Sequence, residues 1–420
     1  MTRTKTNGRI ITLDVVRGVA VMGIVAVNVV AFAMPIQAYF NPTAYGGTSG
    51  LDLLTWAFNF VFVDGRFRGL FSFLFGASLL LVITRAAERG YNPIKIHFRR
   101  MFWLLIFGLV HFYFVWVGDI LFSYAVIGMV AYLFWKKTPK SLLKWAIGLL
   151  VLASLQGGLL ATAFFNTEAA ALAPNASSAA IQEWREMAVT FRALAPDELA
   201  RILSIYGASY ADVVHYRLSE ETIMPFFGTA LAFAERLALM LLGMAALKNG
   251  FLTGAWQSER YRRVALVALG VSLPAYAAFA AILYYSGFRV PLIFMIFFAA
   301  SIPFRTIGFI GYAALIILIA KRGGPLLERI AAAGRTAFTN YLGTSLVATT
   351  IFYGYGLGLF GQLSRAECYL FVVAIWGGML LWSKPWLERY QYGPFEWLWR
   401  SLARWELQPM QKVTSTSPAI

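Results

Sequence analysis

The sequence predicts an all-α fold, a polytopic transmembrane bundle of about ten helical spans with short re-entrant or interfacial helices between them. The chain has 420 residues, of which 59% are hydrophobic and only 13% are charged. Soluble domains carry about 25% charged residues. Apolar runs near the roughly 20 residues that a helix needs to cross a bilayer recur along the whole chain. We therefore interpret residues 1–420 as a single integral membrane domain.

Each expected span is an apolar run bounded by charged or polar loops. The first run follows a basic N-terminus and has no small-residue cleavage site, so we expect a retained helix and not a removed signal peptide. In chain order, the expected spans are 10–34, 66–86, 98–117, 119–135, 141–164, 222–247, 262–286, 303–320, 336–360 and 367–383.

Lysine and arginine are concentrated in alternate loops, which predicts the orientation. The basic segments are 3–9, 85–100, 136–144, 248–263, 321–335 and 384–404. By the positive-inside rule these segments face the cytoplasm, and an even number of spans then places both termini there. We expect a multi-pass protein of the bacterial cytoplasmic (inner) membrane. The net charge of +16 comes from these short loops, so we expect the lipid bilayer as a partner and no nucleic acid.

Two longer segments lie outside the expected spans, one between the fifth and sixth spans and one after the last span. Residues 165–221 carry eight Asp or Glu against four Arg, and we expect an extracytoplasmic cap loop with short helices broken by Pro174 and Pro196. The alternative is a solvated connector without a further role. Residues 385–420 contain an aromatic-rich stretch after Gly393-Pro394, which predicts a cytoplasmic interfacial tail.

Three segments break the simple pattern of spans. Residues 51–64 and 291–302 are apolar but too short to cross the membrane, so we expect interfacial or re-entrant pieces. Irregular backbone at membrane depth is tolerated only where protein or a water-filled cavity covers it. The glycine-rich run 353–358 follows no strand, so we interpret it as a site of close helix packing and not as a nucleotide loop.

The sequence offers few ligands for metals. Cys368 is the single cysteine, so neither an intrachain disulfide nor a cysteine cluster can form. The three histidines are His97, His111 and His215. We expect no metal site.

Helix rise places several polar residues at related depths. Asn28 lies eleven residues past Arg17, and His111 lies eleven residues past Arg100, so both should lie about 16 Å into the membrane. Asp119 and the pair Asp64 and Arg66 should lie nearer the outer side. We hypothesise that one outward-opening polar cavity is lined by Asn28, Asp64, Arg66, His111 and Asp119.

His111 is the candidate general base, because the unperturbed pKa of histidine lies near neutral pH. Asp119 or Asp64 could orient its ring. The alternative is a neutral histidine hydrogen-bonded to a neighbouring helix. Asp14 and Arg17 are three residues apart and share a helix face. They could anchor the helix end by snorkelling, or bind an anionic cytoplasmic ligand such as a phosphate-bearing cofactor.

Glu235 and Arg236 are adjacent in the middle of an expected span and point about 100° apart. Each therefore needs a partner on another helix, as does Arg305. A structural network and a ligand site both remain open for these three residues.

Short motifs spread over the chain carry a family resemblance. They are Arg9-Ile10, Leu13-Asp14, Arg17-Gly18, Val27-Asn28, Val63-Asp64-Gly65-Arg66-Phe67, Leu70 to Gly76, Gly108-Leu109-Val110-His111, Gly118-Asp119-Ile120-Leu121, Tyr124-Ala125, Gly334-Arg335, Thr339-Asn340-Tyr341, Tyr355 to Leu359 and Gly393-Pro394-Phe395-Glu396-Trp397. Over nearly its whole length the chain resembles the YeiB-like membrane proteins, a domain of unknown function. That family is similar to a wider group of transmembrane acyltransferases that includes heparan-α-glucosaminide N-acetyltransferase.

The wider resemblance implies transfer of an acyl group, with acetyl as the expected one, from cytoplasmic acyl-CoA to a hydroxyl or amine outside. The shared opening Asp-x-x-Arg-Gly matches Asp14, Arg17 and Gly18. It implies that Asp14 and Arg17 bind the cofactor, and we expect Arg66 to be a third cofactor-binding residue. Many relatives have a catalytic histidine at or after the end of the first span, where this chain has Asn28 and no histidine in 35–50.

The base role would then fall to His111, supported by Asp119 or Asp64, with Asn28 polarising the acyl carbonyl. The acceptor would be a sugar, a lipid or a small molecule, and a homodimer is possible. A transporter of a small solute or amphiphile is the alternative, because broken helices near the midplane are a transporter feature. A non-catalytic membrane partner is a third interpretation, favoured by the missing histidine.

Overall fold

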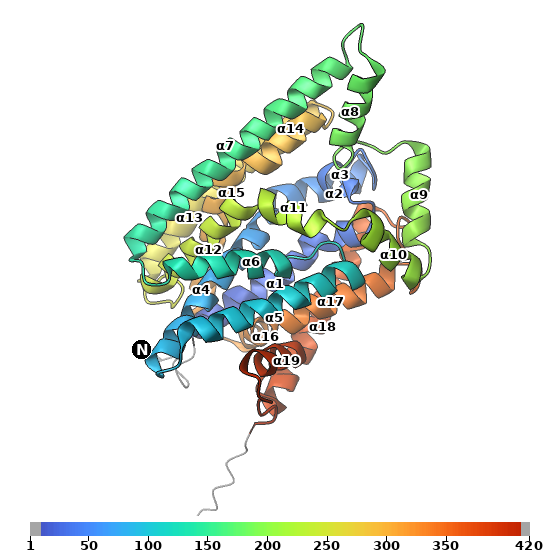
Figure 1. Ribbon diagram of the computed structural model, residues 1–420. Helices are drawn as coiled ribbons and strands as arrows, with labels where there is room; N and C mark the ends of the chain where they lie inside the picture. The colour runs from blue at the N-terminus through green and yellow to red at the C-terminus, as the bar shows by residue number, and fades with distance from the viewer. Residues whose placement is uncertain (1–9, 413–420) are drawn as a thin grey trace, which may run out of the picture.

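The computed structural model describes residues 10–412, and the charges expected at Arg3, Lys5 and Arg9 lie outside them. Within the described range the fold is all-helical and has no β-strand, only an isolated bridge between Tyr390 and Gln411. The predicted all-α class is therefore confirmed. The long apolar helices, shown in Figure 1, are α1 (Ile11–Ala33), α4 (Arg66–Glu88), α7 (Pro139–Ala171), α13 (Ser258–Tyr285), α15 (Ile302–Ala320) and α18 (Arg365–Arg389).

Shorter helices complete the bundle and its two ends. They are α2 (Gln37–Phe40), α3 (Gly50–Phe58), α5 (Pro93–Phe114), α6 (Leu121–Ala131), α8 (Ser178–Ala188), α9 (Pro196–Tyr206), α10 (Tyr210–Glu220), α11 (Met224–Leu231), α12 (Phe233–Lys248), α14 (Val290–Met295), α16 (Pro325–Arg335), α17 (Ala337–Phe352) and α19 (Pro394–Arg404). Two π-helical turns, η1 (Asn59–Val63) and η3 (Ile296–Ala300), and one 3-10 turn, η2 (Tyr132–Phe134), interrupt the regular pattern.

The structure does not confirm the ten spans that the sequence predicts. Among the described residues, six helical segments are long and apolar enough to cross a membrane, and a seventh is added if α11 and α12, bent by 62°, form one span. The expected spans at 98–117, 119–135 and 336–360 do not join them. α5 begins with a basic stretch, whereas α6 and α17 are too short. The chain is a membrane protein built around these apolar helices.

Helix α1 lies in the middle of the bundle. It packs against α4, α15, α16, α17 and α18, and 72% of its most apolar window is buried. By contrast, α7 lies along one edge, beside α12 and α14, and only 22% of its corresponding window is buried (Figure 1). The outer helices can expose apolar side chains because they face lipid, while α1 carries its polar residues inside protein.

Glycines allow the closest helix contacts. A Cβ on Gly76 of α4 would lie 2.0 Å from the carbonyl oxygen of Met240, and one on Gly243 of α12 would lie 1.7 Å from that of Phe73. No other residue fits at either position without moving a backbone. The two glycines therefore set the α4–α12 distance reciprocally, as small residues do in membrane helix packing.

The two ends of the bundle differ in character. The basic end gathers the start of α1, the end of α12 and α19. There Lys248 Nζ donates to the carbonyls of Trp135 and Lys137 at 2.7 Å, and Trp399 Nε1 donates to that of Arg100 at 2.9 Å. The loop end, opposite, carries α2, α3 and the segment α8–α10 (Figure 1).

Segment 165–221 contains the short helices that its alanine-rich pattern predicts, but α7 runs on to Ala171, inside the expected loop. The C-terminal tail, expected to begin at 385, also begins later. α18 continues through Pro385 to Arg389, and α19 follows after Gly393-Pro394. The remainder of the tail, 413–420, lies outside the described residues.

Candidate functional site

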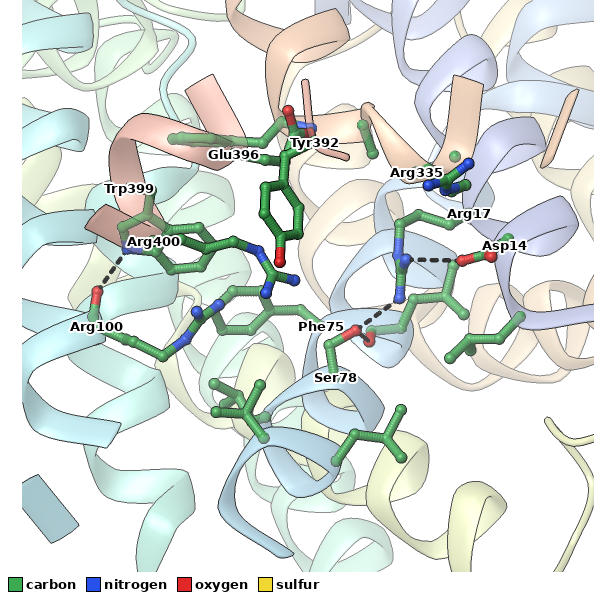
Figure 2. Close-up of a pocket in the computed structure, with 18 of the residues that line it drawn as sticks. Asp14, Arg17, Phe75, Ser78, Arg100, Arg335, Tyr392, Glu396, Trp399 and Arg400 are labelled. Carbon is green, nitrogen blue, oxygen red and sulfur yellow. Dashed lines mark hydrogen bonds and ion pairs between the residues drawn. The ribbon is translucent and has the colours of Figure 1, made fainter. Parts of the chain in front are cut away.

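A cavity of about 460 Å³ opens at the basic end of the bundle. Such a volume is typical of small-molecule and cofactor sites. Its walls come from α1, α4, α5, α6, α16, α17 and α19 together with the connection before α19. Figure 2 shows that charged side chains from α1, α5, α16 and α19 converge on it.

Close backbone packing places the Asp14–Arg17 motif in the wall of this cavity. A Cβ on Gly18 would lie 2.0 Å from the carbonyl oxygen of Ile330, and a Cβ on Gly334 would lie 1.9 Å from that of Asp14. α1 and α16 therefore touch through these two glycines, and Arg335 is brought beside the motif. Glycine is needed at both positions because of this approach.

Arg17 is held within the cavity by two contacts. Its guanidinium donates to Asp14 Oδ1 at 3.3 Å and to Ser78 Oγ of α4 at 3.0 Å (Figure 2). The Arg17 side chain is 23% exposed, so its charge can be reached from the cavity. This geometry matches a positioned cation better than a side chain that snorkels away from the bundle.

Positive charge dominates the mouth of the cavity. Five arginines line it, Arg17, Arg85, Arg100, Arg335 and Arg400, against two carboxylates, Asp14 and Glu396. The Glu396 carboxylate is already engaged by backbone N–H groups. The remaining field attracts anions, and arginine is the residue suited to bidentate phosphate binding.

The C-terminal helix α19 is fixed as one wall of the cavity. Glu396 accepts hydrogen bonds from the backbone N–H of Phe338 at 2.7 Å and of Thr339 at 3.1 Å, at the start of α17. A carboxylate is favourable at a helix N-terminus. Trp399 lies under the guanidinium of Arg100, 4.1 Å from ring centroid to Cζ. The motif Gly393-Pro394-Phe395-Glu396 therefore fixes α19 to the start of α17.

Deeper in the bundle the cavity becomes apolar and ends at two tyrosines. Phe71, Leu74, Leu104 and Leu121 line this part, and Tyr124 and Tyr341 close it. The hydroxyl group of Tyr124 lies 2.7 Å from Ser72 Oγ. The cavity is thus amphipathic, with a cationic mouth and an apolar floor.

His111 and Asp119 meet behind Tyr341. His111 Nδ1 lies 2.8 Å from Asp119 Oδ2, and both side chains are 1% exposed. Asp119 Oδ1 accepts the backbone N–H of Phe122 at 2.8 Å, at the start of α6. A carboxylate oxygen accepts, which assigns the proton of this contact to Nδ1 of the neutral ring. Nε2 of His111 is then an acceptor, and this buried atom has no hydrogen-bond partner in the described residues.

Tyr341 connects the cavity, the His111–Asp119 pair and Asn28. Its ring centroid is 5.3 Å from that of His111. Its hydroxyl group accepts from the N–H of Ile120 at 3.3 Å and lies 3.4 Å from the carbonyl oxygen of Gly118, on both sides of Asp119. Tyr341 also lines a small cavity of about 10 Å³ with Asn28. The residues predicted at similar depth, Asn28 and His111, therefore both lie beside one tyrosine.

Asp64 and Arg66 lie elsewhere, in a second polar cluster (Asp64, Arg66, Arg68, Glu235, Arg236 and Arg305). Asp64 accepts from Tyr39 Oη at 2.5 Å and from Arg68 at 3.0 Å. Arg66 is fully buried, with its guanidinium 3.7 Å from the ring centroid of Tyr276. Neither residue lines the basic-end cavity. The single outward-opening cavity expected to contain Asn28, Asp64, Arg66, His111 and Asp119 is therefore not formed by these five residues together.

Sequence reasoning missed most of the cavity. No ligand-binding role is predicted from the sequence for Arg85, Arg100, Arg335 and Arg400, and Tyr124 and Tyr341 are named only within family motifs. A signal was present for Tyr341, since it belongs to the motif Thr339-Asn340-Tyr341. Its neighbour Asn340 instead joins helices, donating to Ala333 O at 3.0 Å and accepting from Trp382 Nε1 at 2.9 Å. In the part of the chain that the structure describes, no three His, Cys, Asp or Glu side chains gather as metal ligands.

Comparison with known proteins gives three full-length relatives. Residues 246–406 match the family described as "Protein of unknown function (DUF418)". The chain is 30% identical to "Uncharacterized protein YxaH" of Bacillus subtilis, over 98% of both chains. It is 33% identical to "Uncharacterized protein YeiB" of Escherichia coli, over 94% of this chain and 96% of YeiB. A protein from Bacillus acidopullulyticus, "Uncharacterized 39.9 kDa protein in amylase 3'region", is 27% identical over 94% of this chain and 93% of its own length. No solved structure matches the chain significantly.

Proposed function

The chain belongs to the YeiB-like family, DUF418, and we propose that it is a membrane acyltransferase. In this proposal the protein moves an acyl group from acyl-CoA, bound at the basic end, to a hydroxyl or amine acceptor at the other side of the membrane. One observation carries the proposal. The cationic, amphipathic cavity ends at Tyr341, whose ring contacts a buried His111–Asp119 pair with a free Nε2.

The orientation forms part of the proposal. We infer that the basic end faces the cytoplasm, with both termini there, in a multi-pass protein of the bacterial inner membrane. The distribution of charge supports this, because Lys and Arg gather at the basic end and segment 165–221 carries eight carboxylates. Acyl-CoA is then available on the side where the cavity opens.

The cavity fits the chemistry of acyl-CoA at both of its ends. Arg17, Arg100 and Arg400 would hold phosphate groups at the mouth by charge-assisted hydrogen bonds. Asp14 would keep Arg17 in place through the contact seen at 3.3 Å. The apolar floor formed by Phe71, Leu74 and other side chains excludes water around the acyl chain. When bound, acyl-CoA supplies an activated thioester.

The His111–Asp119 pair would handle the proton of the reaction. His111 Nε2 accepts the proton of the acceptor hydroxyl as the new oxygen–acyl bond forms. It then gives the same proton to the thiolate that remains when the carbon–sulfur bond breaks, so the products are an acyl ester and free coenzyme A. Asp119 stabilises the imidazolium between the two steps through the bond at Nδ1. Asn28, beside Tyr341, would polarise the acyl carbonyl.

Release of coenzyme A thiol from acetyl-CoA tests this proposal. Purified protein is incubated with radiolabelled acetyl-CoA and native membrane extract as the acceptor source, and thiol release and labelled product are followed. We expect His111→Ala to lower turnover by about 10²–10⁴-fold, the usual worth of a general base, while His215→Ala, on the exposed α10, stays active. Full activity of a folded His111→Ala protein would remove this residue from the mechanism.

A transporter remains the second candidate, for a specific structural reason. Two π-helical turns and the 62° bend between α11 and α12 interrupt helices of the bundle. Broken helices line substrate sites in many transporters. Movement of an unmodified solute into vesicles that contain the purified protein, with no thiol release, would favour this function over acyl transfer.

A further inference from the structure

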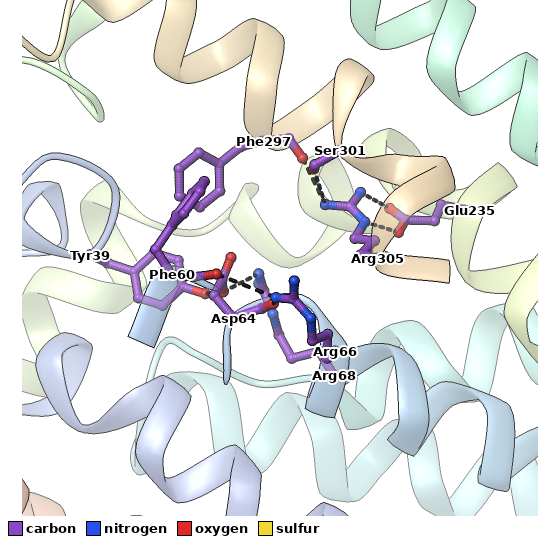
Figure 3. A network of polar contacts seen from close by, with 9 residues as sticks. All are labelled: Tyr39, Phe60, Asp64, Arg66, Arg68, Glu235, Phe297, Ser301 and Arg305. Atoms are coloured by element: carbon purple, nitrogen blue, oxygen red, sulfur yellow. Dashed lines mark hydrogen bonds and ion pairs between the residues drawn. The ribbon is translucent and has the colours of Figure 1, made fainter. Parts of the chain in front are cut away.

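The second polar cluster contains more positive charge than its own carboxylates balance. Four arginines, Arg66, Arg68, Arg236 and Arg305, lie with two carboxylates, Asp64 and Glu235. Figure 3 shows this cluster without Arg236. Buried or membrane-embedded charge is costly unless it is paired. Asp119 is a third carboxylate that acts on Arg236, so the four arginines exceed the nearby carboxylates by one charge, which an additional anion would balance.

Two of the four arginines are committed to the fold. Arg305 makes a bidentate ion pair with Glu235, with both N–O distances 2.6 Å, and donates to the carbonyl of Phe297 at 2.7 Å. Arg66 is fully buried, stacks on Tyr276 and donates to backbone carbonyls at 3.2 and 3.3 Å. Its Nε has no partner among the described residues, so even this arginine keeps an unused donor.

Arg68 and Arg236 are the two arginines that a ligand can reach. The Arg68 side chain donates to Asp64 Oδ1 at 3.0 Å, and it remains 40% exposed. Arg236 is half-buried, and its hydrogen-bond partner is the neutral Ser123 Oγ. Arg68 lies on α4 and Arg236 on α12, two helices that pack against each other, and like charges brought together there repel each other. A guanidinium does not face hydrocarbon at this depth, so its accessible surface faces a polar space.

Arg68 and Arg236 lie beside the His111–Asp119 pair. Ser123, the partner of Arg236, is one helical turn beyond Asp119. On α4, Ser72 is one turn from Arg68 and contacts the Tyr124 hydroxyl that closes the basic-end cavity. The arginine pair thus lies beyond the floor of that cavity, on the side nearer the loop end, and close to the proposed general base.

We propose that Arg68 and Arg236 bind a phosphate group carried by the acceptor. That the ligand is the acyl acceptor rests on the proposed function, whereas binding of a phosphate group at this site does not. Two guanidinium groups with free donors match the oxygens of a phosphate ester, which would also neutralise their mutual repulsion. The anion would hold the acceptor so that its hydroxyl group reaches His111.

The phosphate could belong to a lipid headgroup or to a soluble phosphorylated molecule. The surroundings give lipid a direct path, because α11 and the residue before it expose Ile223, Met224, Phe226 and Phe227, at 47–72% of their surfaces. Phe226 contacts Phe122, the neighbour of Ser123. Segment 165–221 carries eight carboxylates against four arginines, which disfavours the approach of a soluble anion through the loop end.

Equilibrium binding to the full-length protein, without acyl-CoA, tests the site. One probe is radiolabelled glycerol 3-phosphate, and the other is labelled phosphatidylglycerol in phosphatidylcholine nanodiscs. We expect saturable binding that Arg236→Gln weakens at least tenfold, Arg236→Lys partly restores and Arg263→Gln, which removes an exposed charge at the basic end, leaves within twofold. Size-exclusion chromatography checks that each variant is folded.

The outcomes separate the two proposals. Binding of phosphatidylglycerol alone supports a lipid-borne phosphate, and binding of glycerol 3-phosphate supports a soluble one. Absence of saturable binding by either probe, or equal binding by a folded Arg236→Gln protein, would overturn the site. If Arg236-dependent binding is found but no coenzyme A thiol is ever released, the phosphate site stands and the acyltransferase proposal falls.

Discussion

At the scale of single residues, the arrangement around His111 derives from two hydrogen bonds to Asp119. Asp119 can only accept, from His111 Nδ1 and from the N–H of Phe122. The ring is thereby held with Nε2 free in a buried position. Sequence reasoning offered Asp119 or Asp64 as the residue that orients His111, and the structure pairs His111 with Asp119. Spacing along the sequence could not indicate Tyr341, more than 200 residues away, because that contact depends on how α17 packs against α5.

Tyr341→Phe tests whether this tyrosine positions Asp119. The change keeps the ring beside His111 and removes the hydroxyl group that contacts Ile120 N–H and Gly118 O. We expect kcat for thiol release to fall about tenfold, the worth of one or two hydrogen bonds, while the Kd for acyl-CoA is unchanged. Equal losses in kcat and in acyl-CoA affinity would instead assign Tyr341 to the binding of the donor.

The ion pair between Arg192 and Glu198 gives segment 165–221 a defined dependence on pH. The Arg192 guanidinium, with both N–O distances 2.7 Å, and the Ala195 N–H lower the pKa of Glu198 from its usual 4.5 to about 2. Because the folded-state pKa is lowered, the stabilisation is complete above about pH 4.5 and disappears as pH falls through 2.

Hydrogen exchange at the start of α9 measures this stabilisation. We expect wild-type protection to be constant above pH 4.5 and to decrease below it, whereas Glu198→Gln exchanges faster already at pH 7. Glu183→Gln, an exposed change on α8, serves as the matched control. Identical exchange of wild type and Glu198→Gln at pH 7 would show that the pair does not order the loop.

At the scale of helices, hydrophobic runs predicted that a helix is present better than they predicted where it ends. The expected span 336–360 keeps its apolar character to its end, but α17 ends at Phe352. The run 353–361 then turns back on the helix, and the N–H of Phe360 donates to the carbonyl oxygen of Phe352 at 2.6 Å. Its glycines do serve close packing, as expected. A Cβ on Gly354 would lie 2.0 Å from the carbonyl oxygen of Gly207 in segment 165–221. Apolarity alone cannot distinguish a buried turn from one more turn of helix.

The contact between α4 and α12 makes a prediction for helix packing. Gly243→Ala forces a methyl group onto the carbonyl oxygen of Phe73, and overpacking of this kind costs about 1–3 kcal/mol. Gly270→Ala, on the exposed face of α13 with no atom within 4 Å of the added Cβ, should be neutral or slightly stabilising. Thermal denaturation of both purified variants measures the difference, and equal melting temperatures would refute the packing role of Gly243.

At the scale of the whole molecule, the proposed function gives the protein a donor side and an acceptor side. The basic-end cavity approaches Tyr124 and Tyr341 from one side, and Arg68 and Arg236 lie on the other. Family membership, helical class and the Asp14–Arg17 motif could be predicted from the sequence. The assembly of five arginines into one cavity could not, because they lie on α1, α4, α5, α16 and α19, and only tertiary packing brings these helices together.

Orientation in the membrane can be tested by cysteine labelling. In a Cys368→Ser background, Asn175→Cys lies in segment 165–221 and Lys137→Cys lies at the basic end, and both positions are exposed. We expect an impermeant maleimide to label Asn175→Cys in intact cells and Lys137→Cys only after the cells are opened. The reverse pattern would place the basic cavity outside the cytoplasm and remove acyl-CoA as its ligand.

Equilibrium dialysis of the purified protein against radiolabelled acetyl-CoA tests the central claim most directly, because it needs no acceptor. The account predicts saturable binding that Arg17→Ala and Arg400→Gln each weaken about tenfold, as expected for loss of one charge-assisted contact, while Arg263→Gln leaves it unchanged. Absence of saturable binding, or binding that is equal in wild type and in the two cavity variants, would contradict the assignment of the basic-end cavity to an acyl donor.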